Sequence, residues 1–479
     1  MPTDWLGLLP GLILAAGGTL ALAAAFWGTR PRWLLFALAL ASAAAAGGVA
    51  ALVEPALPTS QGMVDLGGFA RFFTCLLAAI TGLTALFVRK YGEERAFAGD
   101  EFYGLLLFAA LGMVLVAGAL NWVIFFLGLE LLSLALYVLI AIRKGEAASN
   151  EAGLKYFIMG AVASGFLTFG IALLYAMSGT LDILGSLAAA ATYPQHLPGI
   201  ILALALILVG VGFKLSLVPF HLWTPDVYAG APAPVTAFLS TGSKVALFAA
   251  LLRFSLLVAA PVWDYCLPAL WVLAALTMGV GNLTALYQTR IKRLLAYSSV
   301  AQMGYLLMTL LAVRQGGLPA LIFYLAVYAV MDLGAFGLVG SFSGPESDRD
   351  ALTDYQGLGY SQPWRAGILA LCLVSLAGLP PTAGFMGKLL LFRAVLEAHY
   401  PVLAVIGIFT VVLSLFFYMK VVVVLYMQSP LDGMVVPRAD FAVSLAALVV
   451  VVLILWLGLV PSALLALVSQ IAAAMPSLT

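Results

Sequence analysis

The sequence predicts an all-α polytopic membrane protein, and its composition and its long apolar runs support that fold class. Of 479 residues, 64% are hydrophobic and only 9% are charged, and the mean hydropathy is +1.12, whereas soluble domains are about 25% charged. The formal net charge is +1. Without a block of lysine and arginine to bind phosphates, nucleic-acid binding is excluded.

Apolar runs delimit the membrane spans. A window of about 19 residues predicts about fourteen transmembrane helices. They cover residues 5–27, 33–53, 67–88, 102–118, 121–142, 154–176, 197–218, 233–257, 264–286, 293–313, 317–341, 362–396, 401–427 and 441–460. The boundary at Asn121 between two of these spans is the least distinct.

Lysine and arginine, which collect in cytoplasmic loops, indicate the topology. One side holds Arg30, Arg32, Arg89, Lys90, Arg95, Arg143, Lys144, Lys155, Arg290, Lys292, Arg293, Arg349, Arg365 and Arg438. The other side holds little beyond Arg253, Arg314 and Arg393. We therefore expect both termini on the non-cytoplasmic side. Because no basic residue precedes Arg30, the start does not resemble a cleavable signal peptide, and the first helix is expected to remain.

Two spans are interrupted by proline and glycine, at residues 219–234 and 378–387. Proline removes a backbone donor and glycine loosens a helix, so both segments should break it. Unwound backbone at membrane depth needs protein or water to satisfy it. Broken helices in corresponding positions indicate inverted repeats around a transport site.

We expect two inverted-topology five-helix repeats, each containing one broken helix. The first repeat should cover residues 101–260 (helices 4–8) and the second residues 261–430 (helices 9–13). Residues 1–100 should form helices 1–3, and residues 431–479 should form a C-terminal transmembrane helix.

Four charged residues, Glu130, Lys214, Lys244 and Lys388, lie inside apolar spans or at their breaks. A charge at the membrane centre costs about 2.5–3.5 kcal/mol on insertion scales, so each needs a partner, water or a function. Glu130 and Lys244 are too far from their span ends to reach the headgroups, and a purely structural buried ion pair is the alternative for them. Headgroup contact is expected for Arg71, Arg253, Arg393 and Lys420.

Polar residues accompany two of the buried charges. Ser240 lies one turn before Lys244, and Tyr324, Tyr328 and Asp332 repeat every four residues and so share one helix face. Asp332 is a fifth charge within the membrane. It is either a second proton-relay group or the partner of one lysine, and the sequence leaves both interpretations open.

A redox cofactor or metal held by this chain is not expected. Cys75, Cys266 and Cys372 lie in separate apolar runs without a metal-ligand motif, and there are only three histidines. The fragment Gly210-Val211-Gly212 lacks the context of a phosphate-binding loop. Energy for transport must therefore come from partner subunits.

Several motifs resemble subunit N of bacterial respiratory complex I, the proton-pumping NADH:quinone oxidoreductase, in the antiporter-like membrane subunit family. They are the run from Trp223 to Lys244 and the segments 128–134, 292–299 and 378–385. The similarity extends over essentially the whole chain.

The resemblance implies a proton-translocating membrane-arm subunit of the bacterial cell inner (plasma) membrane, next to other antiporter-like subunits. NADH, FMN, iron–sulfur clusters and quinone would be bound by partner subunits, with no redox catalysis in this chain. The alternatives are a stand-alone Mrp-type Na⁺/H⁺ antiporter subunit, a membrane subunit of a related ferredoxin- or F420-dependent complex, and a passive structural subunit.

The resemblance also assigns roles to residues. Glu130 and Lys214 match a pair on the fifth and seventh helices, Lys244 matches the central proton carrier, and Lys388 matches the residue leading to the exit. His221 matches a relay between the half-channels. Asp332 departs from the family, in which asparagine is expected at this position.

A physical mechanism agrees with these roles. A lysine buried away from water loses its charge readily, and a carboxylate about 4 Å away contributes about 4 kcal/mol toward restoring it at an effective dielectric of about 20. Making or breaking one ion pair would therefore switch a lysine between holding and releasing a proton. We hypothesise that Glu130 and Lys214 form this switch, that Lys244 takes a proton from the cytoplasmic side, and that Lys388 passes it outward.

Overall fold

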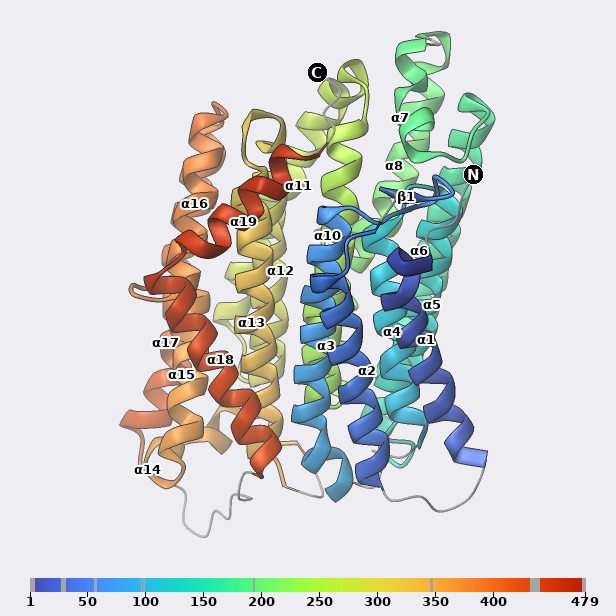
Figure 1. Ribbon diagram of the computed structural model, residues 1–479. Helices are drawn as coiled ribbons and strands as arrows, with labels where there is room; N and C mark the ends of the chain where they lie inside the picture. Colours follow the sequence, from blue (N-terminus) through green and yellow to red (C-terminus); the bar gives the residue numbers. More distant parts are fainter. Residues whose placement is uncertain are drawn as a thin grey trace.

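The computed structural model describes residues 5–26, 32–55, 58–95, 97, 100–192, 194–344, 348–430 and 440–475. It confirms an all-α membrane protein, a bundle of roughly parallel and antiparallel helices (Figure 1). The α-helices are α1 (Trp5–Phe26), α2 (Arg32–Leu52), α3 (Gly68–Glu94), α4 (Asp100–Gly118), α5 (Trp122–Ile140), α6 (Ala147–Ser178), α7 (Ile183–Thr192), α8 (Leu197–Lys214), α9 (Thr224–Gly230), α10 (Ala233–Leu257), α11 (Ala260–Leu286), α12 (Ile291–Leu310), α13 (Leu318–Phe342), α14 (Leu358–Ser361), α15 (Pro363–Ala377), α16 (Ala383–Glu397), α17 (Pro401–Met427), α18 (Phe441–Leu459) and α19 (Ser462–Ala473). Short 3₁₀ turns lie at Pro194–His196, Val313–Gln315 and Leu352–Tyr355.

Within these residues, 12 helices are long and apolar enough to cross a membrane. Two further predicted spans also have helical counterparts. The span 293–313 corresponds to α12, which carries Ser298, Ser299 and Gln302 and is less apolar. The span 362–396 divides into α15 and α16. The total of fourteen crossings and the division into two repeats remain predictions.

Both predicted helix breaks are present. One separates α8 from α9 and α10, and the other separates α15 from α16. In the second break, Gly378 ends α15 with a φ of +87°, a backbone conformation that glycine adopts without strain. A Cβ at this position would lie 2.8 Å from Cδ of Lys388. Glycine therefore both ends the helix and makes room for that lysine.

The centre of the bundle is formed by α10 and α13. Within their membrane-spanning windows, 94% of the α10 residues and 100% of the α13 residues are buried. Figure 1 shows α10, α12 and α13 between α1–α6 on one side and α15–α18 on the other. The side chains of Lys244 and Asp332, on these two central helices, are therefore held away from lipid.

A short β-hairpin closes one end of the bundle. β1 (Thr59–Ser60) pairs antiparallel with β2 (Val64–Asp65), with Thr59 opposite Asp65. Asp65 forms a 2.5 Å ion pair with Arg253, whose side chain is only 4% exposed. The prediction that Arg253 is a headgroup anchor is wrong, because its charge is satisfied inside the protein.

Several basic residues of the predicted cytoplasmic side meet at the other end of the bundle. Asp226 pairs with both Lys155 (3.1 Å) and Arg293 (2.7 Å). The start of α1 and the end of α19 both lie in the upper half of Figure 1, toward the end that holds the β-hairpin. Arg30 and Arg438, which also contributed to the predicted topology, lie outside the described residues.

Candidate functional site

Lys244 lies at the centre of a hydroxyl-rich cluster formed by α10, α12 and α13. The fully buried Lys244 donates a hydrogen bond from Nζ to Oγ of Ser299 (2.5 Å). The Ser299 hydroxyl is hydrogen-bonded to that of Tyr328 (2.6 Å). Tyr328 OH lies 3.3 Å from Oδ2 of Asp332, and Ser240 Oγ donates to the same oxygen (2.5 Å).

Lys244 and Asp332 are joined through hydroxyl groups. No ion pair within 4.0 Å connects them among the described residues, although both are buried. Oδ1 of Asp332 has no hydrogen-bond partner there. Because a hydroxyl both donates and accepts, the Ser299 and Tyr328 side chains can carry a proton between the amine and the carboxylate.

Lys388 forms the second cluster, at the break between α15 and α16. Its Nζ donates to the carbonyl oxygens of Leu376 (2.7 Å) and Ala377 (3.1 Å). These are two of the last carbonyls of α15, which have no partner within their own helix. A cation is also favoured at this end by the helix dipole. The broken helix therefore supplies the binding site for the lysine charge.

Polar side chains from α12, α13 and α17 extend the Lys388 cluster. Gln302 donates from Nε2 to the Leu376 carbonyl (3.3 Å) and accepts at Oε1 from Tyr324 OH (2.5 Å). Gln302 Nε2 also reaches Tyr418 OH (3.3 Å), which is hydrogen-bonded to Ser298. The hydroxyls and the amide thus form a connected network beside Lys388.

The two clusters share helices α12 and α13. Tyr328 belongs to the Lys244 cluster and Tyr324 to the Lys388 cluster, one helical turn apart on α13. In the part of the chain that the structure describes, no direct hydrogen bond joins these two tyrosines. The two side chains leave α13 about 6 Å apart along the helix axis, at about 1.5 Å per residue, which is close to the span of one water with two hydrogen bonds of about 2.8 Å each.

Glu130 and Lys214, the predicted pair, have separate partners. Glu130 on α5 accepts a 2.6 Å hydrogen bond from Ser164 on α6. Lys214, the last residue of α8, is 3% exposed and donates to Tyr156 OH (3.3 Å). Its Nζ lies 4.6 Å from the centre of the Tyr156 ring and 5.2 Å from that of Tyr137. Across the described residues, no ion pair joins Glu130 to Lys214.

His221, the other predicted relay residue, lies in the break between α8 and α9. It is 8% exposed, and its Nδ1 has no hydrogen-bond partner among the described residues. Its ring centre lies 6.4 Å from that of Tyr297. The structure does not connect His221 by a hydrogen bond to either Lys214 or Lys244 in the described ranges.

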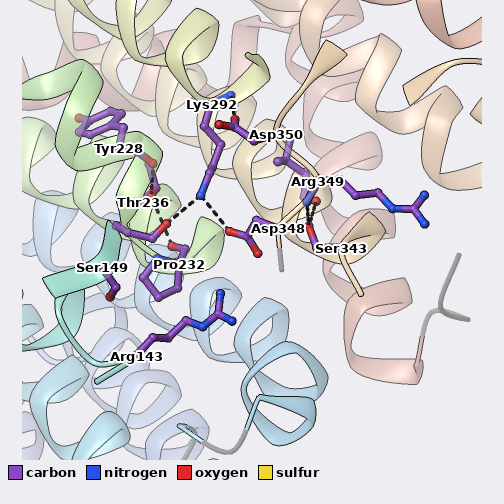
Figure 2. Close-up of polar contacts among 12 residues, drawn as sticks. Arg143, Ser149, Tyr228, Pro232, Thr236, Lys292, Ser343, Asp348, Arg349 and Asp350 are labelled. Atoms are coloured by element: carbon purple, nitrogen blue, oxygen red, sulfur yellow. Dashed lines mark hydrogen bonds and ion pairs between the residues drawn. The ribbon is translucent and has the colours of Figure 1, made fainter. Parts of the chain in front are cut away.

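A buried charged cluster at the basic end was not predicted as a site. Figure 2 shows Lys292 between Asp348 and the start of α10. Lys292 Nζ lies 2.8 Å from Oδ2 of Asp348, and the two side chains are 3% and 9% exposed. Asp348 also pairs with Arg95 (3.3 Å). In the sequence, Lys292 was identified only as one of the basic residues on the predicted cytoplasmic side and as part of the motif at 292–299.

The polar face of α12 was also missed. Ser298, Ser299 and Gln302 contribute to the two networks described above. Their spacing of one and three residues places them on one side of the helix. The presence of three polar residues within the otherwise apolar span 293–313 was the sequence signal that could have identified this face.

No metal site is present within the described ranges, where no group of three or more histidine, cysteine or acidic side chains could hold an ion. The three cysteines are free thiols.

Comparisons with known proteins agree with this architecture. Residues 119–414 match the family described as NADH:quinone oxidoreductase/Mrp antiporter, TM. NADH-quinone oxidoreductase subunit N 1 of Solidesulfovibrio magneticus is 49% identical over 468 residues, covering 96% of this chain and 97% of that protein. A chain of respiratory complex I from Thermus thermophilus with bound aureothin is 36% identical, with a TM-score of 0.82 and coverage of 95% and 98%. A chain of the Mrp complex from Dietzia sp. DQ12-45-1b is 25% identical, with a TM-score of 0.84 and coverage of 98% and 96%.

Proposed function

We propose a proton path through this chain, which belongs to the NADH-quinone oxidoreductase subunit N family. It is a membrane-arm subunit of a multi-subunit, proton-translocating enzyme, and other membrane-arm subunits are its partners. In this proposal, protons enter from the cytoplasm at the basic end and leave at the end that holds the β-hairpin. Both termini then lie on the non-cytoplasmic side of the bacterial inner membrane.

The observation that supports the path best is the hydroxyl-linked cluster around Lys244. An amine and a carboxylate are buried on the two central helices and are bridged by Ser299 and Tyr328. A structural ion pair would be expected to join the two charges directly. Hydroxyl groups between them separate the charges while leaving a route for a proton.

Lys244 is the central proton carrier in this proposal, and Lys388 receives the proton on its way out. Gln302, which accepts a hydrogen bond from Tyr324, donates to the Leu376 carbonyl that Lys388 also uses. A proton passes from one cluster to the other along α13, where Tyr328 and Tyr324 are one turn apart.

Glu130 and Lys214 act as the switch that sets the charge of the first half-channel. In the structure they have separate partners, Ser164 and Tyr156. We assign this arrangement to the open state of the switch, and His221 to a relay between Lys214 and Lys244. In the closed state, the Glu130 carboxylate approaches Lys214 and stabilises its charge.

Redox chemistry in partner subunits, which hold NADH, FMN, iron–sulfur clusters and quinone, drives the switch in this proposal. The free energy that this chemistry supplies has to match the cost of moving a proton against the membrane potential, about 2.3 kcal/mol per charge for each 100 mV. A stand-alone Mrp-type antiporter is the alternative. Purification in mild detergent separates the two: hydrophilic redox subunits that co-purify support the complex I assignment, and their absence supports the antiporter.

Asp332→Asn tests the role of the carboxylate. Asparagine can still accept hydrogen bonds from Ser240 and Tyr328, so the cluster geometry is expected to persist without the charge. We expect proton pumping to fall by less than about tenfold, the effect of about 1.4 kcal/mol. Asp332→Leu, which removes the acceptor as well, is expected to have the larger effect. A loss with Asp332→Asn as large as that with Lys244→Met, measured in reconstituted vesicles, would make Asp332 an obligatory relay group.

A further inference from the structure

Lys292 joins three helices at the basic end of the bundle. Its Nζ donates to the Ala231 carbonyl (3.0 Å) and to Oδ2 of Asp348 (2.8 Å), as Figure 2 shows. Lys292 is the second residue of α12, Ala231 lies just before α10, and Asp348 follows the end of α13 by six residues. Lys292, at the start of α12, therefore connects that helix to the segment before α10 and to the segment after α13.

These three helices are the ones that supply the Lys244 cluster. α10 carries Lys244, α12 carries Ser299, and α13 carries Tyr328 and Asp332. Because α10 starts after a helix break, no continuous helix fixes its position along the membrane normal from that side. Thr236 donates to the Tyr228 carbonyl across this break, and the Lys292 contact to Ala231 adds a restraint from α12.

Asp348 anchors the cluster to the rest of the bundle. Its Oδ1 accepts from Tyr91 OH (2.6 Å) and pairs with Arg95 (3.3 Å), and the Arg95 side chain is 1% exposed. The segment after Asp348 lies along the start of α12, where Asp350 Oδ1 accepts from the Lys292 backbone N–H (3.1 Å). The loop after α13 is therefore held at both a side chain and the backbone of α12.

The Asp348 carboxylate stays ionised in this position. Burial alone would raise its pKa, but the charges of Lys292 and Arg95, together with hydrogen bonds from Lys292 and Tyr91, hold the pKa below the ordinary carboxyl value. A lowered pKa means that the stabilisation is present at neutral pH and is lost only as the pH falls through that value. The ion pairs are thus intact under working conditions.

We propose that Lys292 is a positioning residue, which fixes α10, α12 and α13 relative to one another and so sets the hydrogen-bond distances between Lys244, Ser299 and Asp332. This proposal rests on the proposed function, in which those distances govern proton transfer. A displacement of about 1 Å at a reacting group can reduce a rate by about a hundredfold, so a restraint on three helix ends has a direct effect on the pump.

Lys292→Met, Lys292→Arg and Lys292→Gln in the intact complex test this role. The control is Arg290→Gln, which breaks a neighbouring ion pair with Asp350 (3.8 Å) whose arginine is 61% exposed. Proton pumping is measured per assembled complex in vesicles. We expect a reduction of about ten- to a hundredfold for Lys292→Met, substantial recovery with Lys292→Arg, and no change in the control.

Normal pumping per complex by Lys292→Met, with only the amount of assembled complex reduced, would overturn the positioning role. If Lys292→Met does not assemble, Lys292→Gln provides the test, because its shorter, neutral side chain loses the ion pair with Asp348 and cannot contact Asp348 and Ala231 at once. Pumping per complex is expected to fall in this variant, and normal pumping would overturn the positioning role. Normal pumping by Lys244→Met would instead refute the proposed function itself. The two failures are therefore distinguishable.

Discussion

Replacing Lys244 with methionine is expected to stop proton translocation through this subunit. Methionine is apolar and of similar length, so it fills the site without carrying a proton. Removal of a positioned proton-transfer group lowers a rate by about a hundredfold or more. The measurement is the proton-to-electron ratio of the complex in sealed vesicles with NADH and quinone, and an unchanged ratio would refute the central role of Lys244.

The variant should remain folded and assembled. Ser299 keeps its hydrogen bond to Tyr328 when the amine is removed, and Asp332 keeps its contacts with Ser240 and Tyr328. Lys420→Met is a matched control, because among the described residues its amine bonds only the Gln288 carbonyl (3.2 Å), at an exposed position. We expect that control to pump normally.

Replacement of Lys388 with methionine is expected to impair both pumping and stability. The Ala377 carbonyl would lose its donor, while the Leu376 carbonyl would keep Gln302. A hydrogen bond from a charged group contributes about 1.5–3 kcal/mol, so the thermal unfolding temperature of the complex should fall. Pumping should fall to a similar extent as in Lys244→Met.

Lys388→Arg separates these two effects. The guanidinium group can donate to the same carbonyls, but it does not release a proton in proteins. We therefore expect recovery of thermal stability without recovery of pumping. If Lys388→Arg pumps like the unmodified complex, Lys388 serves only to cap the broken helix, and the proposed exit step is wrong.

The helical framework could be predicted because each span and each break has a local cause. Apolar runs long enough for a bilayer predict the helices, and proline and glycine next to Lys214 and Lys388 predict the two breaks. Positions far from any span end also identified Lys244, which is fully buried, and Glu130, which is partly buried, as charges within the bundle. All of these features depend on residues that are close together in the sequence.

Contacts between distant segments could not be predicted in the same way. Arg253 and Lys292 both lie near span ends, where a headgroup contact and a buried ion pair give the same sequence pattern. Their partners, Asp65 and Asp348, are 188 and 56 residues away. The separate partners of Glu130 and Lys214 likewise depend on how α5, α6 and α8 pack.

The hydroxyl network illustrates the same limit. Tyr324, Tyr328 and Ser240 stood out because they share a face with a buried charge. Ser299 and Gln302 on α12 did not, because no charged residue of that helix lies next to them in the sequence. Packing of α12 against α10 and α13 brings Ser299 to Lys244 and Gln302 to Tyr324.

The most direct test of the proton path is a density map of the assembled complex that resolves ordered water molecules. Hydrogen-bonded water or hydroxyl groups should connect Tyr328 to Tyr324 and so join the Lys244 and Lys388 clusters. Apolar packing between those tyrosines, with no water in that interval, would contradict conduction through the centre of this protein.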